Sequence, residues 1–124
     1  MYKFIVLACF LPFLPTSSTL YTQPPGPLAP KEYAQKIVTE HWDSSQWKHF
    51  DDLIKEESEW DSNAQNPNSS AYGLGQFLSS TWETVGCKKT PDPYIQLDCT
   101  VKYIAKEYET PAEALRFQLA NDWY

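Results

Sequence analysis

The helical spacing of apolar residues in the middle of the chain constrains the fold more than any other feature of the sequence. Trp47, Phe50, Ile54 and Glu57 stand at i, i+3, i+7 and i+10, which places all four on one face of a helix. Glu57 therefore ends an apolar stripe that should face the core, whereas its neighbour Glu56 should face water. The pattern predicts a helix that carries one carboxyl group into an apolar wall.

This position gives Glu57 a physical reason to differ from the other acidic residues. Burial disfavours the charged form of a carboxyl group and raises its pKa. A carboxyl group that stays protonated near neutral pH can serve as a general acid. The alternative is an ordinary glutamate in the last turn of a helix, half exposed to solvent, and the spacing alone does not separate the two.

The remaining hydrophobic pattern is also helical, because no long stretch alternates between apolar and polar residues. We expect a mainly α domain of about five helices, with at most a small β-hairpin in residues 61–77. The expected helices cover residues 31–42, 46 to 57 or 58, a short segment from 80, 93–108 and 111–120.

Several boundaries carry helix-capping signals. Asp43-Ser44-Ser45 offers N-caps for the second helix, and Asp92-Pro93 offers one for the fourth. Ser80-Thr-Trp-Glu83 and Thr110-Pro-Ala-Glu113 read as capping boxes, and Gly86 should end the short helix. The apolar residues of the last helix that are available for burial are Ala114, Leu115, Phe117 and Leu119.

Length and charge restrict the class of function. A chain of 124 residues is one small domain, and its net charge of −6 argues against nucleic acid or an anionic membrane surface as the partner. His41 and His49 are the only histidines, and no CxxC or HExxH motif occurs. We therefore predict neither a metal site nor a cofactor.

The N-terminal residues have the composition of an export signal. Lys3 precedes an apolar run of 11 residues at positions 4–14, which is shorter than the roughly 20 residues that a membrane span needs. We predict a signal peptide over residues 1–19, with an uncleaved N-terminal anchor as the alternative. Residues 20–30 contain four prolines and form a predicted linker, so the domain should cover residues 31–124.

Removal of the signal peptide takes Cys9 with it and leaves Cys87 and Cys99. An even pair of cysteines in an exported domain favours a disulfide, and two buried free thiols are the alternative. Closure of a loop of about 13 residues stabilises by about 3 kcal/mol in the chain-entropy model.

A polar loop and a glycine turn follow the Glu57 helix. The loop covers residues 61–70 and contains Asn66-Pro67, and the turn is Ala71-Tyr-Gly-Leu-Gly-Gln76. With Glu57-Ser58, this arrangement resembles the catalytic core of lysozyme-like lytic transglycosylases, the SLT domain, which cleave the glycan strands of bacterial peptidoglycan. The likeness runs from about residue 46 to the end of the sequence, and the closing Trp123-Tyr124 is similar to compact, often phage-encoded members.

The resemblance implies roles for individual residues. Glu57 would be the single acid/base in a reaction that cleaves the MurNAc–GlcNAc bond and forms 1,6-anhydro-MurNAc. Ser58 would orient local hydrogen bonds, Gln76 would line the saccharide groove, and Tyr103 would hydrogen-bond near Glu57. The turn residues Gly73 and Leu74 would also belong to the substrate-binding set.

The sequence departs from the family pattern in three places. Gly75 stands where many members have Met, Trp60 stands where Phe is commoner, and Arg116-Phe-Gln118 replaces the Ala-Tyr-Asn-Ala-Gly segment of longer members. These departures concern the substrate contacts more than the catalytic glutamate.

Two alternatives to this activity remain open. One is a lysozyme-type hydrolase, which needs a second carboxylate, with Asp61, Glu83 and Asp98 as candidates. The other is a glycan-binding module without turnover. In either case the expected partner is peptidoglycan, the protein is expected to act as an exported monomer in the periplasm, the cell envelope, the extracellular space or a virion, and no membrane partner is expected beyond the possible anchor.

Overall fold

Five helices make up the regular structure of the computed structural model, which describes residues 26–124. The predicted signal peptide and the first part of the predicted linker lie outside the described residues. The helices are α1 (Pro30–His41), α2 (Gln46–Ser58), α3 (Ser79–Thr84), α4 (Pro93–Glu107) and α5 (Pro111–Asn121). The prediction of a mainly α domain with about five helices is confirmed.

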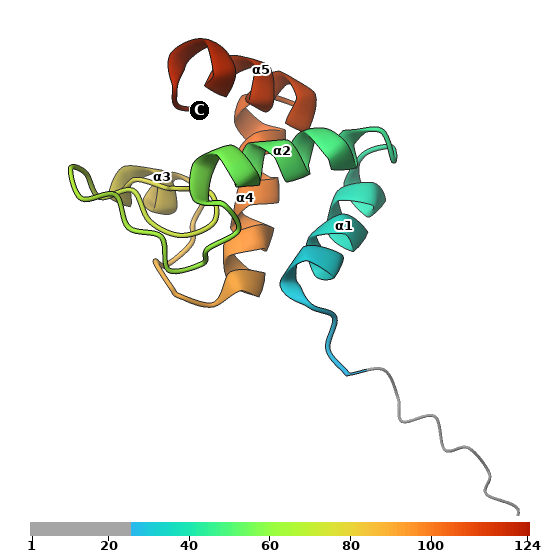
Figure 1. The fold of residues 1–124 in the computed structure, drawn as a ribbon, viewed down its shortest axis with the longest axis horizontal. Helices are drawn as coiled ribbons and strands as arrows, with labels where there is room; N and C mark the ends of the chain where they lie inside the picture. Colours follow the sequence, from blue (N-terminus) through green and yellow to red (C-terminus); the bar gives the residue numbers. More distant parts are fainter. Residues whose placement is uncertain (1–25) are drawn as a thin grey trace, which may run out of the picture.

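Helix α2 is the centre of the arrangement (Figure 1). It packs against α5 and α1, and α1 also packs against α4. The apolar stripe of α2 supplies Phe50, Leu53 and Ile54, each with 0% exposure, to the core. The other members of this cluster come from α1, the turn after α2, α4 and α5: Ala34, Val38, Leu74, Leu97, Val101, Ile104, Ala114 and Leu115.

The helix starts follow the sequence in some places and not in others. Asp92 caps α4 by accepting hydrogen bonds from the backbone N–H groups of Tyr94 and Ile95, as predicted. The Ser80 capping box is wrong: α3 begins at Ser79, and its N-cap, Leu78, makes no side-chain capping bond. The hydroxyl of Ser70 accepts from the Ser79 N–H instead, so the preceding loop satisfies this donor.

Two further predictions are corrected. Ser45 is the N-cap of α2 but makes no side-chain capping bond. Its hydroxyl and its backbone N–H both donate to the Asp43 carboxylate instead. Leu119 is not a core residue, since its side chain is 61% exposed on the outer face of α5. Gln118 is the neighbouring residue that is buried.

The segment between α2 and α3 is irregular. It contains two isolated antiparallel bridges, Gln65 with Tyr72 and Tyr72 with Phe77, and no ladder forms within residues 26–124. Glu59 and Trp60 both have positive φ angles, 52° and 64°, directly after the end of α2. Such conformations strain residues other than glycine, and they turn the chain sharply away from Glu57.

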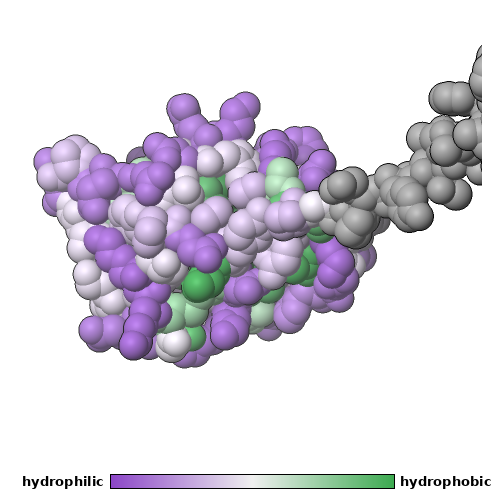
Figure 2. Space-filling model, turned by 90° about the horizontal axis from the view of Figure 1, so that it is seen from below, coloured by the Kyte–Doolittle hydropathy of each residue, from purple (hydrophilic) through white to green (hydrophobic). Residues whose placement is uncertain are grey.

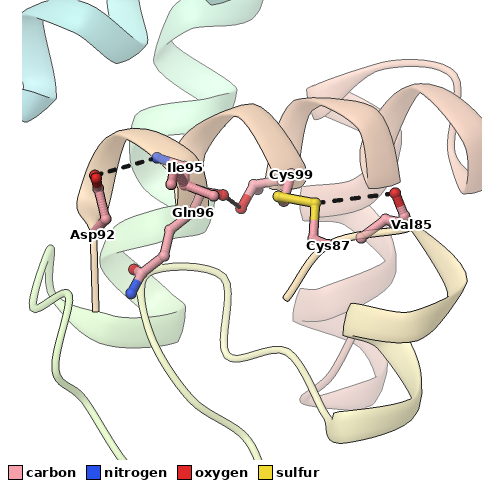
Figure 3. Close-up of a disulfide and its surroundings, with 7 residues drawn as sticks. Val85, Cys87, Asp92, Ile95, Gln96 and Cys99 are labelled. Atoms are coloured by element: carbon pink, nitrogen blue, oxygen red, sulfur yellow. Dashed lines mark hydrogen bonds between the residues drawn. A yellow bond between two sulfur atoms is a disulfide. The ribbon is translucent and has the colours of Figure 1, made fainter. Parts of the chain in front are cut away.

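A disulfide joins Cys87, which follows α3, to Cys99 on α4, with the Cα atoms 6.4 Å apart (Figure 3). The sequence favoured this pairing. Cys99 is buried in a second cluster with Phe77 and Trp82. The bond therefore fixes the short helix α3 and the segment around Phe77 to the long helix α4.

Loss of the disulfide is expected to destabilise the protein by about 3 kcal/mol, because the linked residues are 12 apart in sequence and the closed loop restricts the unfolded chain. Urea unfolding of the Cys87→Ser/Cys99→Ser variant measures this loss. Unfolding of the wild type in a reducing agent is the control and should give the same free energy. A loss below about 1 kcal/mol would contradict the expected contribution of the loop.

The face displayed in Figure 2 is mostly hydrophilic, and apolar residues occur on it only in small separate areas. Within residues 26–124, no helix combines the length and apolar character that a membrane crossing requires. The same residues contain no group of three or more His, Cys, Asp or Glu side chains that could hold a metal ion.

Candidate active site

Glu57 lies in the last turn of α2 and its side chain is half-buried. Its Oε1 atom is shielded from solvent and has no hydrogen-bond partner. Burial, aided by the negative charge of Glu56, raises the pKa of Glu57 from 4.5 to about 7. Glu57 can therefore hold a proton at neutral pH and release it to a basic atom placed against it.

A small cleft of about 150 Å³ opens at Glu57. Residues from α2, the glycine turn, α3 and the end of the chain surround it: Glu57, Gln76, Phe77, Leu78, Thr81, Trp123 and Tyr124. Apolar and aromatic side chains predominate in this set, so the cleft lowers the local polarity around the carboxyl group. Among the described residues, Glu57 is the one acidic side chain in its lining.

The candidates for a second carboxylate lie elsewhere. Asp61 is exposed and accepts a hydrogen bond from the backbone N–H of Asn63. Glu83 is exposed on α3. Asp98 accepts a hydrogen bond of 2.7 Å from the Tyr33 hydroxyl and lines a separate groove that also includes residues of α1. None of the three lines the cleft at Glu57.

Gln96 on α4 holds the glycine turn in place from behind. Its side-chain oxygen accepts from the Leu74 N–H at 2.8 Å, and its amide nitrogen donates to the carbonyls of Ser62 at 2.9 Å and Thr90 at 2.8 Å. A Cβ atom on Gly73 would come within 2.8 Å of the Gln96 side chain, and Gly73 has a φ of +81°. Position 73 therefore requires glycine both for its conformation and for this close approach. Figure 3 shows the Gln96 side chain directed from α4 towards the turn.

Gln76 stands at the cleft with a φ of +50°. Its amide nitrogen donates to the carbonyls of Ala64 in the polar loop and Gly73 in the turn, which fixes the turn to the polar loop. Both of these hydrogen bonds use the amide nitrogen, so the side-chain oxygen of Gln76 is available to another partner. A strained residue that is held by two hydrogen bonds at a cleft is a common feature of functional sites.

Comparison with protein-family models matches residues 37–120 to the family described as the transglycosylase SLT domain. The matched region covers more than half of the chain and contains Glu57 and the glycine turn. The chain belongs to the transglycosylase SLT domain family. No curated protein and no solved structure matches the chain significantly.

The residues that the resemblance to the SLT family singled out lie partly at the cleft and partly in the interior. Glu57 and Gln76 meet at the cleft. Ser58 is buried, and its hydroxyl donates to the carbonyl of Ile54 within α2, so it fixes the last helical turn. Gly73 and Leu74, which the resemblance includes in the substrate-binding set, are both buried, neither lines the cleft, and Leu74 belongs to the core. Their contact with substrate stays a prediction.

Tyr103 occupies a supporting position in this SLT domain. Its ring packs edge-on against Phe77, with centroids 5.1 Å apart, and against Tyr124, with centroids 5.6 Å apart. No hydrogen bond joins the Tyr103 and Glu57 side chains among the described residues, where Glu57 Oε1 is unpaired, and the expectation that Tyr103 hydrogen-bonds near Glu57 stays a prediction. Burial raises the pKa of the Tyr103 hydroxyl.

Sequence reasoning missed the contribution of the last two residues to the site. Trp123 and Tyr124 line the cleft together with Gln76, although they follow Glu57 by more than 60 residues in the sequence. The ring of Trp123 is 61% exposed and meets Phe117 edge-on at 4.9 Å. The available signals were the aromatic character of the closing residues and their likeness to compact family members, and neither gives information about their distance from Glu57.

Proposed function

We propose that this SLT-domain protein is a peptidoglycan lytic transglycosylase that uses Glu57 as its single acid/base. The observation that carries the proposal is the Glu57 carboxyl group, half-buried in an apolar cleft with one unpaired oxygen, in a chain of this family. Membership of the family supports peptidoglycan as the substrate, and the disulfide fits an exported protein.

The proposed reaction begins with proton transfer. Protonated Glu57 donates its proton to the oxygen that joins MurNAc to GlcNAc, and the bond from this oxygen to C1 of MurNAc breaks. The N-acetyl carbonyl oxygen of MurNAc stabilises the positive charge that develops at C1. Glu57, now a carboxylate, removes the proton of the MurNAc 6-hydroxyl, whose oxygen attacks C1. The products are GlcNAc with a free hydroxyl and 1,6-anhydro-MurNAc, and Glu57 is again protonated without consumption of water.

This scheme needs one carboxyl group with a pKa near the working pH. A hydrolase of the ordinary type uses two carboxyl groups, roughly 5–9.5 Å apart. The absence of a second acidic side chain from the described lining of the cleft favours the lyase reaction over hydrolysis.

The other named residues have supporting roles in the proposal. Gln76 contacts the glycan through its side-chain oxygen, since its amide nitrogen is occupied. Ser58 keeps the last turn of α2 regular beneath Glu57. Tyr103 supports Phe77 and Tyr124, which form part of the cleft wall.

Incubation of the purified protein with purified peptidoglycan tests the proposal. We expect soluble muropeptides to be released from the insoluble wall. A folded, disulfide-bonded protein that sediments with peptidoglycan but releases nothing would contradict the proposal and point to a glycan-binding module. Absence of both binding and release would contradict any role of this chain in glycan recognition.

Cleavage is expected to depend on pH through Glu57. Because the protonated form starts the reaction, kcat/KM for a soluble peptidoglycan fragment should be constant below about pH 7 and fall about tenfold per unit above it. Initial rates between pH 5 and 9 measure this profile. The Glu56→Gln variant is the control: it removes a charge that raises the Glu57 pKa, so the fall should begin at lower pH. A profile that rises through pH 7 would contradict the assignment of Glu57 as proton donor.

A further inference from the structure

Tyr124, which lines the cleft, carries an unexplained polar atom. Its hydroxyl oxygen is buried and has no hydrogen-bond partner. The ring is held from two sides, by Tyr103 with centroids 5.6 Å apart and by Tyr108 with centroids 6.0 Å apart. An unpaired buried hydroxyl is unfavourable in the free protein, so packing of the ring alone does not account for a tyrosine in this place.

Gly75 provides the space that the hydroxyl occupies. A Cβ atom at position 75 would lie 3.0 Å from the Tyr124 hydroxyl oxygen, and 2.9 Å from both Phe77 and the Thr100 hydroxyl. The φ angle of Gly75 is not in the left-handed region, in contrast to those of Gly73 and Gly86. Glycine is therefore required at position 75 because neighbouring side chains approach it closely. The Tyr124 hydroxyl packs against the turn that carries Gln76 at this point.

Glu57 Oε1 and the Tyr124 hydroxyl are thus two buried polar atoms without partners, and they belong to two residues that line the same cleft. Burial first, and the charge of Glu57 second, raise the pKa of Tyr124 well above its usual value, so the hydroxyl keeps its proton and acts as a donor. Both atoms can form hydrogen bonds with oxygen atoms of a ligand. A ligand that enters the cleft would then supply the partners that the free protein lacks.

On the basis of the proposed function, we propose that Tyr124 is a substrate-binding residue whose hydroxyl donates a hydrogen bond to an oxygen of the sugar unit that Glu57 cleaves. Gly75 makes room for this hydroxyl. The ligand is a glycan of N-acetylated sugars, because ring, hydroxyl and carbonyl oxygens are available as acceptors on each unit. The last residue of the sequence then belongs to the active site.

The Tyr124→Phe substitution tests the proposal, because it keeps the ring and removes only the hydroxyl. In a Glu57→Gln background, which prevents turnover, we expect the affinity for soluble, uncross-linked peptidoglycan strands to fall about tenfold by calorimetry. The thermal midpoint of the free protein should stay the same or rise, since an unpaired hydroxyl is lost. Tyr33→Phe is the matched control: it removes a hydroxyl that is bonded to Asp98, so its midpoint should fall and its affinity should not change.

Unchanged affinity after Tyr124→Phe would overturn the proposal. A joint fall in affinity and thermal midpoint would also overturn it, because the hydroxyl would then stabilise the free protein. These results differ from failure of the proposed function, in which the protein with Tyr124 intact neither binds nor cleaves the strands.

A double-mutant cycle with Gly75→Ala tests the second part. The contacts of the added methyl group with Phe77 and Thr100 are the same in both backgrounds, so they cancel in the cycle. We expect Gly75→Ala to weaken binding at least fivefold when Tyr124 is present and less than twofold in Tyr124→Phe. Equal losses in the two backgrounds would overturn the claim that Gly75 makes room for the hydroxyl.

Discussion

Replacement of Glu57 by Gln is expected to lower the rate of peptidoglycan cleavage by about 10³- to 10⁴-fold. General acid or base catalysis contributes about 10²- to 10⁴-fold, and in the proposed mechanism Glu57 performs both steps. The loss corresponds to about 4–5.5 kcal/mol in the activation barrier. Gln has the shape of protonated Glu but has no acidic proton to give, so binding of the glycan should be largely retained. Release of soluble muropeptides measures the rate, and sedimentation with peptidoglycan measures the binding.

Protein stability provides an internal control for this variant. Folding raises the pKa of Glu57 from 4.5 to about 7, so between these values the native state binds more protons than the unfolded state and stability falls as pH rises. Gln does not titrate. Glu57→Gln should therefore gain stability relative to the wild type through this window, by up to about 3 kcal/mol at pH 8, where the native wild type carries the charge. An inactive variant with this gain cannot owe its inactivity to unfolding.

Glu56→Gln is the matched substitution for both experiments. It makes the same chemical change one residue away, on an exposed side chain of the same helix. We expect it to retain cleavage at pH 6 within a few-fold. Equal activity losses in the two variants, or full activity in Glu57→Gln, would contradict the assignment of Glu57.

Replacement of Gln96 by Leu is expected to cost about 3–5 kcal/mol of stability and to abolish most of the cleavage activity. Gln96 is 1% exposed and forms three hydrogen bonds with backbone groups, those of Ser62, Leu74 and Thr90. Leu is similar in size but leaves a donor and two acceptors without partners, each at a cost of about 1–3 kcal/mol when buried. The Gly73–Gln76 turn should then lose its fixed position beside Glu57. Urea unfolding and the muropeptide release assay measure the two effects.

Gln118→Leu is the control for Gln96→Leu. Gln118 is also buried, at 8% exposure, but its side-chain oxygen has no hydrogen-bond partner. The same substitution there removes an unsatisfied atom, so stability should be unchanged or higher. Similar losses at both positions would show that burial of the glutamine side chain, and not its hydrogen bonds to the turn, determines the effect.

The helices could be predicted because each has an apolar face with a repeat that the sequence displays directly. The stripe of α2, from Phe50 to Ile54, is buried as its spacing indicates. Local capping motifs were less informative. The Ser80 capping box failed because the hydroxyl of Ser70, ten residues earlier, satisfies the first N–H of α3. A contact of this kind depends on how the loop folds back, which a four-residue motif does not contain.

In the candidate site, too, local features could be predicted from the sequence and contacts between distant residues could not. The location of Glu57 at the end of the stripe gave a reason for a raised pKa, which the half-buried carboxyl group has, although the spacing alone left an ordinary last-turn glutamate open. Gln96 and Tyr124 were missed because their partners are distant in sequence. Gln96 bonds to Leu74, 22 residues earlier, and Tyr124 lines the same cleft as Glu57, 67 residues earlier. The resemblance to the family singled out Tyr103, on the same helix as Gln96, as the tyrosine near Glu57. The tyrosine that lines the cleft is Tyr124.

The most direct test of the central claim is the mass of the products that the wild-type protein releases from purified peptidoglycan. Cleavage by Glu57 alone, without water, predicts muropeptides that end in 1,6-anhydro-MurNAc and are lighter by one water than hydrolysed ones. Products with reducing ends only would contradict this mechanism and require a second carboxylate to activate water, for which Asp61, Glu83 and Asp98 would have to be re-examined.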